Sequence, residues 1–326
     1  MATWGELLLR LKELLESGEP APHDKLRREA LATLHQYTGR NTILYAAGHL
    51  QKPQAGQEVL SISDEDLEGF MEVIYGLEGD QLDLILHSPG GVAEAADSLV
   101  QYLRSKLSDI RVIVPQMAMS AATMMACAAN RIVMGRHSKL GPIDPQLQMR
   151  TEIGVQLVPA QAVLDQFERA KEECVDQPTL AVWYPILRQY GPALLVQCQN
   201  AINHSKGVVA QWLAEFMFAG REDAAERAQK IADALGEHGV HLTHGRPLGK
   251  EYLRDELGLE IDNLEDDQEL QDRVLTVYHA FMHTFMGTGA AKLIENHVGR
   301  AWVKMVRPIP APTAKPEEEA AESQSA

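Results

Sequence analysis

The first half of the chain alternates between short apolar runs and longer segments with a helical period. The apolar runs are four to six residues long and lack the polar alternation of a sheet that faces water on one side. We expect strands at 42–47, 82–87, 110–115 and 131–134. The segments around them predict helices at 64–75, 92–106 and 120–129. Strands alternating with helices predict an α/β fold with a parallel sheet.

The remaining sequence is predicted to be mostly helical, with further helices at 7–15, 24–36, 159–175, 185–204, 267–285 and 290–298 and a helical region at 206–235 that is broken around Gly220. We divide the chain into four parts: an N-terminal helical segment (1–38), an α/β core (39–205), a mostly helical C-terminal region (206–305) and an acidic tail (306–326). The tail is rich in proline and glutamate and has no apolar period, so it is predicted to be disordered.

Composition narrows the class of protein. Of 326 residues 45% are hydrophobic, enough for a sizeable core, and the net charge of −16 argues against a nucleic-acid partner. The three cysteines form no CxxC pair, so neither a disulfide framework nor a cysteine zinc site is expected. No apolar signal core or membrane-length run stands out, and a cytoplasmic location is expected. The Leu-rich helix at 7–15 is expected to pack on its own chain, with a peripheral membrane contact as the alternative.

Two small-residue turns carry the candidate chemistry. Ser120 follows an apolar strand and opens a helix, and Gly90-Gly91 ends the preceding strand. A serine at such a junction is exposed to a substrate and can act as a nucleophile. The N–H of Ala121 and the side-chain-free Gly90-Gly91 turn are the expected oxyanion donors. The competing interpretation is an ordinary helix N-cap beside an ordinary turn.

These segments resemble a known family. Ser88-Pro89-Gly90-Gly91, Met119-Ser120-Ala121-Ala122 and Leu140-Gly141-Pro142-Ile143-Asp144-Pro145, in this order, are similar to motifs of the Clp protease/crotonase-like fold. The chain most resembles S49-type prokaryotic serine peptidases, the "serine dehydrogenase proteinase" family. The resemblance implies a stacked β-β-α core, with the helical region at its C-terminal side, and assembly into a homo-oligomer.

The residue that activates Ser120 is less clear from the sequence. Where Clp-type proteases place a histidine, this chain has Ile143 or Asp144, so the sequence does not predict a Clp-type triad. S49-type peptidases use a serine–lysine dyad, and the resemblance implies Lys171, 51 residues after Ser120. Three nearby glutamates would hold such a lysine in its charged form. The alternative bases are Lys139, His137, Asp144 and His87.

Two other groups of residues, several histidines and a glycine-rich segment, are weaker indications of a binding site. Histidines gather at His238, His241 and His244, and His279 and His283 share a helix face at the spacing of helical metal ligands, but no glutamate follows His279 directly. The glycines of 287–292 lack the dinucleotide fingerprint and follow no predicted strand. The sequence therefore predicts neither a metal nor a cofactor.

The leading function is a serine peptidase that cleaves peptides, unfolded segments or membrane-derived segments through an acyl-enzyme. One alternative is a crotonase-like acyl-CoA enzyme, which would use the same oxyanion turn without a nucleophilic serine. The other is a catalytically silent scaffold that binds peptides. Labelling of Ser120 by an active-site-directed probe separates the three.

Overall fold

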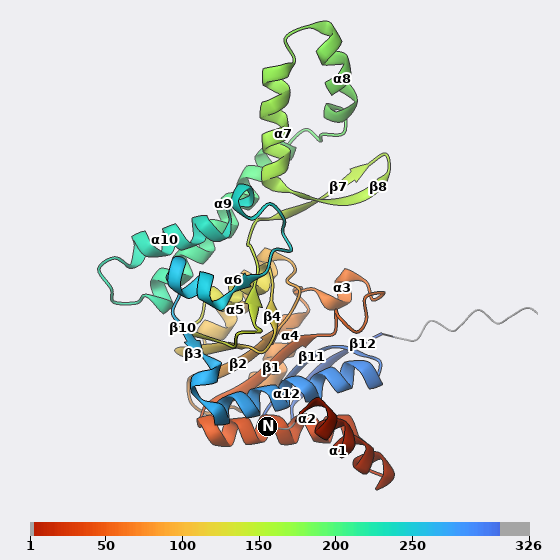
Figure 1. Cartoon of the computed structure of the whole chain (residues 1–326), viewed down its shortest axis with the longest axis vertical. Coiled ribbons are helices and arrows are strands. Elements are labelled where there is room, and N and C mark those ends of the chain that lie inside the picture. The colour runs from red at the N-terminus through yellow and green to blue at the C-terminus, as the bar shows by residue number, and fades with distance from the viewer. Residues whose placement is uncertain (1–2, 307–326) are drawn as a thin grey trace, which may run out of the picture.

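A computed structural model describes residues 3–306 of the chain (Figure 1). The tail predicted at 306–326 lies, apart from its first residue, outside the described residues. No helix between residues 3 and 306 is long and apolar enough to cross a bilayer.

A seven-stranded sheet forms the centre of the molecule, in the order β10-β5-β3-β2-β1-β11-β12. Its first five strands in this order are mutually parallel, whereas β11 runs antiparallel to β1 and β12 antiparallel to β11. The four strands expected from the apolar runs are present, and the α/β fold is confirmed. The bounds are β1 Asn41–Ala47, β2 Gln81–His87, β3 Asp109–Val114, β5 Arg131–Met134, β10 Ile261–Asn263, β11 Ala290–Asn296 and β12 Ala301–Met305.

The helix expected at 290–298 is wrong, because these residues form strand β11. Lys292 and Glu295 are three residues apart, a spacing compatible with the polar face of a helix. Both side chains are instead fully buried, Lys292 against Asp66 at 2.7 Å and Glu295 against Arg27 at 2.7 Å. A charged residue can face solvent or can be buried in an ion pair, and the sequence pattern alone does not distinguish these two cases.

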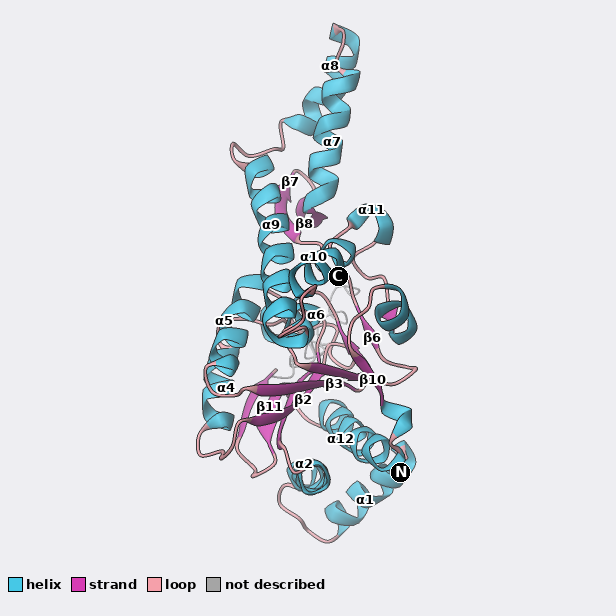
Figure 2. Cartoon of the chain, turned by 90° about the vertical axis from the view of Figure 1, so that its left-hand side faces the viewer, coloured by secondary structure: helices cyan, strands magenta, loops and turns pink. Residues whose placement is uncertain are grey.

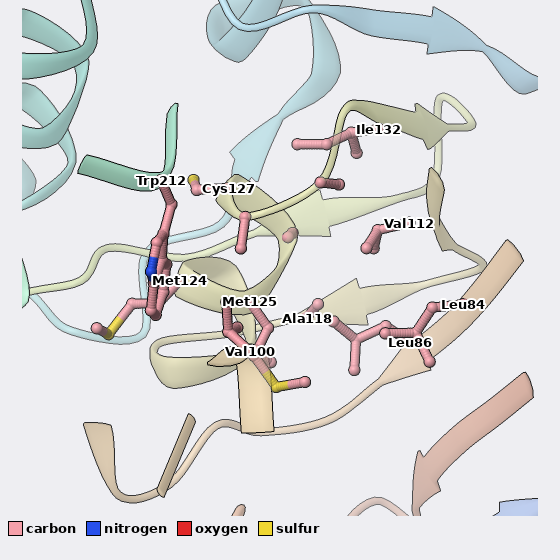
Figure 3. Close-up of a cluster of buried hydrophobic side chains, with 14 of the residues drawn as sticks. Leu84, Leu86, Val100, Val112, Ala118, Met124, Met125, Cys127, Ile132 and Trp212 are labelled. Carbon is pink, nitrogen blue, oxygen red and sulfur yellow. The ribbon is translucent and has the colours of Figure 1, made fainter. Parts of the chain in front are cut away.

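Helices cover both faces of the sheet (Figure 2). One face is packed mainly by α4 (Asp66–Ile74), α5 (Ala93–Arg104) and α6 (Ala121–Cys127), and the other by α1 (Trp4–Glu16), α2 (Pro22–Thr38) and α12 (Gln268–Gly287). Figure 3 shows the core under α6, where sheet residues meet Met124, Met125 and Trp212. In α1, Leu7, Leu11 and Leu14 are buried against the chain itself.

An arm projects from this core (Figures 1 and 2). It comprises the hairpin β7–β8 (Gln146–Thr151, Gly154–Pro159), α7 (Ala160–Glu173), α8 (Gln177–Leu187) and the start of α9 (Leu194–Trp212). Its small core joins α7 to α9 through Ala160, Val163, Leu194, Cys198 and Ile202. The prediction of a single helix at 185–204 is wrong. Helix α8 ends at Leu187 and α9 begins at Leu194, and the loop between them contains Gly191-Pro192, a pair that is typical of turns.

A second, three-stranded sheet lies beside the first and consists of β4 (Met117–Ala118), β6 (Lys139–Leu140) and β9 (Leu248–Gly249). The other elements are α3 (Gln57–Leu60), α10 (Ala224–Leu235) and α11 (His238–His241), the π-helical turns Leu213–Met217 and Tyr252–Glu256, and the 3-10 turn Leu264–Asp266. The region 206–305 is mostly helical, as expected, but it also contributes three strands, β10, β11 and β12, to the central sheet.

Candidate active site

Ser120 lies in the sharp turn between β4 and α6. Its backbone has φ 53° and ψ −121°, a conformation that non-glycine residues rarely adopt and that costs about 1–3 kcal/mol. The ordinary reason for a serine at this position is absent, because its side chain makes no capping hydrogen bond to α6. A half-buried serine held in a strained strand-to-helix turn is the geometry of a nucleophile elbow.

The Gly90-Gly91 turn lies directly against Ser120. An extension of β2 pairs with β4, with the Ser88 N–H donating to Met117 O at 3.1 Å and the Met119 N–H to Ser88 O at 3.0 Å. Gly90 has φ +99°, and a Cβ built there would lie 2.6 Å from Met119 O and 2.7 Å from the Cβ of Ser120. Only glycine permits this approach of the two turns.

A buried ion pair supports the turn from its other side. Ile62 pairs with Gly91, donating its N–H to Gly90 O at 2.8 Å, and a Cβ on Gly91 would lie 2.3 Å from Ile62 N. The residues flanking Ile62 are held by Lys292, which donates to Ser61 O at 2.6 Å, and by Asp66, which accepts the Ser63 N–H at 3.0 Å. Burial lowers the pKa of Lys292, and the charge of Asp66 opposes this shift.

Two backbone donors beside Ser120 have no hydrogen-bond acceptor within residues 3–306: the N–H of Gly91 and the N–H of Ala121. Gly91 lies on the exposed side of its turn, and Ala121 is the first residue of α6. Free backbone donors on either side of a candidate nucleophile are the groups that hold an oxyanion in acyl transfer.

Lys171, the base that the resemblance implies, lies on α7 in the arm. Its side chain is 57% exposed, and its Nζ donates to Glu168 Oε2 at 2.6 Å. Figures 1 and 2 both place α7 in the arm and α6 in the sheet core. The contacts of Lys171 are thus those of a solvated helix residue.

The surroundings of three alternative bases, His87, His137 and Lys139, differ from those of Lys171. His87 is fully buried and packs on Tyr278 and Phe281 of α12, on the sheet face opposite α6. Burial, with a smaller contribution from the charge of His49, lowers its pKa to about 3. His137 is exposed in the turn after β5, and Lys139 lies in register with Met117 on β6.

Asp144 is the alternative base with the most developed surroundings. Its carboxylate is buried and accepts hydrogen bonds from Nδ1 of His238 at 2.9 Å and Nδ1 of His244 at 2.7 Å. Burial tends to raise the pKa of Asp144, but the hydrogen bonds and charges of His244 and His238 outweigh it and hold the pKa below its usual range. The sequence shows these histidines only as a late cluster, and nothing in their spacing indicates a partner about a hundred residues earlier.

Comparisons with known proteins show the family of the chain. A family model described as ClpP-like SDH-type serine proteinase matches residues 59–286. Two uncharacterised proteins of Methanocaldococcus jannaschii are 31% and 29% identical over 202 residues, 62% of this chain. The alignments cover 60% and 59% of the relatives, so the chain spans about three fifths of the length of the curated relatives it matches.

Two solved structures are also similar to part of the chain. Both are forms of the 1510-N membrane-bound stomatin-specific protease, one a serine-to-alanine mutant and the other a lysine-to-alanine mutant in complex with a substrate peptide. They are 16% and 17% identical, with TM-scores of 0.38 and 0.39. Each match covers 65% of this chain, and 79% and 75% of the solved chains.

Proposed function

Because the chain belongs to the family of ClpP-like SDH-type serine proteinases, we propose that it hydrolyses peptide bonds with Ser120 as the nucleophile. The observation that carries the proposal is the contact between the strained Ser120 turn and the Gly90-Gly91 turn. A structural serine has no need of a backbone conformation that costs about 1–3 kcal/mol.

In this mechanism the Oγ of Ser120 attacks the carbonyl carbon of the scissile peptide. The carbonyl oxygen becomes an oxyanion and is held by the N–H groups of Gly91 and Ala121, which have no acceptor within the described chain. Each such donor contributes about 2.7–4 kcal/mol to the transition state. Loss of the amine leaves an acyl-enzyme on Ser120, which water then hydrolyses.

The crotonase-like alternative uses the oxyanion turn but requires no strain at the serine. The conformation of Ser120 and its lack of a capping role favour the peptidase over an acyl-CoA enzyme or a silent scaffold. Peptides, unfolded segments or membrane-derived segments are the proposed substrates.

The serine–lysine dyad, with Lys171 as the base, is the arrangement for proton transfer that the resemblance implies. It requires Lys171 to leave Glu168 and reach Ser120 from the arm, and the 2.6 Å ion pair with Glu168 is its present contact. It is tested below against a matched residue on the same helix.

We also propose that the protein forms a homo-oligomer through its arm. Apolar side chains there are left exposed, among them Ile153 at 83%, Val175 at 81% and Val182 at 70%. Exposed apolar side chains on a projecting arm are available to a second copy of the chain. A monomeric mass by light scattering would contradict this assembly.

Two further expectations stay predictions. One is a peripheral membrane contact of α1, whose Leu9 and Leu15 are exposed, and the other is the cytoplasmic location.

A fluorophosphonate probe tests the proposed function directly. The wild-type chain should be labelled, Ser120→Ala should not, and Ser98→Ala should be labelled like the wild type. Ser98 is the matched control, because it is an exposed serine on α5 that bonds only to Glu94 O. Peptide hydrolysis should fall by about 10⁶-fold in Ser120→Ala, as when a serine nucleophile is removed elsewhere. A wild type without labelling at any pH, together with binding of an acyl-CoA, would favour the crotonase alternative instead.

A further inference from the structure

A buried lysine is bonded to the segment of chain that lies against the oxyanion turn. Lys292 lies on β11, opposite Ala47 of β1, and its side chain is inaccessible to solvent. A lysine ammonium group has three donors. Those of Lys292 meet Ser61 O at 2.6 Å and the two carboxylate oxygens of Asp66 at 2.7 and 2.9 Å. The ammonium group is therefore fully bonded, and one of its bonds goes to the backbone.

Asp66 holds the other end of the same segment. Its Oδ2 accepts the Ser63 N–H at 3.0 Å and the hydroxyl of Tyr45 at 2.7 Å. Asp66 is the first residue of α4, where the positive end of the helix dipole favours a carboxylate. Burial and the charge of Asp66 raise the pKa of Tyr45, so its phenol stays protonated and donates. The ion pair thus holds residues 61–63 at both ends.

Ile62, between these two ends, pairs with the oxyanion turn. The Ile62 N–H donates to Gly90 O at 2.8 Å, and Ile62 O accepts the Val92 N–H at 3.0 Å. In this parallel bridge the N–H and C=O of Gly91 itself point away from Ile62. Since the C=O and N–H of one trans peptide point in opposite directions, the bond to Gly90 O fixes the direction of the Gly91 N–H.

Lys292 is linked to this N–H through two peptide groups in series. It donates to Ser61 O, and the N–H of that peptide, which belongs to Ile62, donates to Gly90 O. The N–H of the next peptide is that of Gly91. Hydrogen bonds in such a chain polarise one another, and they do so most in a low-dielectric interior. A charge-assisted bond at the start of the chain therefore makes the last N–H a stronger donor.

From this chain of bonds we propose that Lys292, paired with Asp66, is the positioning residue of the oxyanion donor at Gly91. The inference rests on the proposed function. Lys292 does not act as the base of Ser120, because its three donors are bonded to Ser61 and Asp66. It holds residues 61–63 so that the peptide between the two glycines keeps its N–H available. Without it that peptide can turn over, and the Gly90 carbonyl then replaces the donor.

The same strand offers a matched control. Glu295, three residues after Lys292, is also fully buried and pairs with Arg27 at 2.7 Å. Arg27 lies on α2, which packs on the sheet face opposite α4. Within residues 3–306 no hydrogen bond joins this pair to residues 61–63. The two pairs are thus alike in burial and strand, and differ in contact with the oxyanion turn.

The test replaces each pair by apolar side chains, so that no unpaired charge stays buried. Such a replacement is often neutral for folding, whereas removing one partner is not. Lys292→Met with Asp66→Leu should lower the maximal rate of fluorophosphonate labelling about 10²-fold, at the lower end of the loss of one oxyanion donor. The probe concentration at half-saturation should not change. Arg27→Met with Glu295→Leu should be labelled at the wild-type rate, and chemical unfolding checks that both variants fold.

Hydrogen exchange reports on the segment itself. The amides of Ile62 and Val92 should exchange faster than in the wild type when Lys292 and Asp66 are replaced, and at the wild-type rate in the control. Tyr45→Phe removes one hydrogen bond to Asp66 and leaves the charges paired, so it should fold even if the double variant does not. Its maximal labelling rate should fall about two- to tenfold, the effect of one hydrogen bond.

Three results would overturn the role of Lys292 and leave the proposed function intact, provided that Ser120→Ala is unlabelled. One is a wild-type labelling rate in the folded double variant of Lys292 and Asp66. Another is an equal loss in the control pair, which would mean that any damage to β11 slows labelling. The third is a wild-type rate in Tyr45→Phe. Failure of the proposed function looks different, because the wild type itself then remains unlabelled.

Discussion

The two halves of the candidate site differ in the kind of group that forms them, backbone in one and side chains in the other. The oxyanion half consists of backbone groups from two neighbouring turns, which pack so closely that a single Cβ on Gly90 would collide with Met119 O. The other half, around the alternative base Asp144, consists of side chains from segments about a hundred residues apart, which are joined through its carboxylate. Backbone positions are fixed by the core, whereas side-chain partners depend on how distant loops meet.

The difference extends to what lies beneath each half. The oxyanion turn rests on the central sheet and on the buried pair of Lys292 and Asp66, both fully inaccessible to solvent. Removing one partner of such a pair leaves an unpaired buried charge and costs about 3–5 kcal/mol. His238 and His244, by contrast, stay partly exposed. We therefore expect substitutions in the first half to affect folding and catalysis together, and those in the second to affect mainly catalysis.

The largest effect is expected for Gly90→Ala in the backbone half. The new Cβ would lie 2.6 Å from Met119 O and 2.7 Å from the Cβ of Ser120, so the two turns must separate. Displacing one oxyanion donor lowers the rate about 10²–10³-fold, and the positive φ adds about 1–3 kcal/mol of strain. Fluorophosphonate labelling and chemical unfolding measure the two effects.

Gly79→Ala is the control for strain alone. Gly79 has φ +78°, similar to Gly90, but a Cβ there would meet nothing within 4 Å. This variant should lose stability to a similar degree and keep its labelling rate. Equal labelling in the two variants would show that the close approach of Gly90 does not position a donor.

The backbone half was also the more predictable from sequence. Gly90-Gly91 come soon after the apolar strand β2, and Ser120 and Ala121 come soon after β3, with only the short β4 between. Because neighbouring parallel strands end on the same side of a sheet, these local patterns predicted that the two turns lie close together. The link from Asp144 to His244 depends on β6 pairing with β9, two-residue strands that have no sequence signature. Strand β11 was missed for the related reason that its charges are paired inside the core.

An intermediate effect is expected on the free energy of unfolding when the pH falls, because a buried histidine lies next to the oxyanion turn. His87 precedes the oxyanion turn, and burial lowers its pKa to about 3, whereas the unfolded chain has an ordinary histidine pKa of about 6.5. Between these values the unfolded state binds more protons, so stability is present at higher pH and is lost as the pH falls. The loss is about 1.4 kcal/mol per pH unit, or about 2 kcal/mol from pH 6.5 to 4.5.

Urea unfolding at several pH values measures this contribution. His87→Leu keeps an apolar side chain against Tyr278 and Phe281 and removes the titrating group. The difference in unfolding free energy between pH 6.5 and 4.5 should shrink by about 2 kcal/mol relative to the wild type. An identical acid dependence in both proteins would mean that water reaches His87 and that the oxyanion turn does not rest on a dry layer.

The smallest effect is expected for Lys171→Ala, and it decides whether the base of Ser120 comes from the arm. Lys171 and Glu168 are 57% and 64% exposed, so their ion pair contributes about 0–1 kcal/mol to stability. If Lys171 is not the base, labelling should match that of Arg169→Ala, which removes the neighbouring exposed pair with Glu173 on the same helix. If Lys171 is the base, labelling should instead fall about 10²–10⁴-fold in this variant alone. That result would place the base of Ser120 in the arm. Proton transfer would then require α7 to move towards the sheet core.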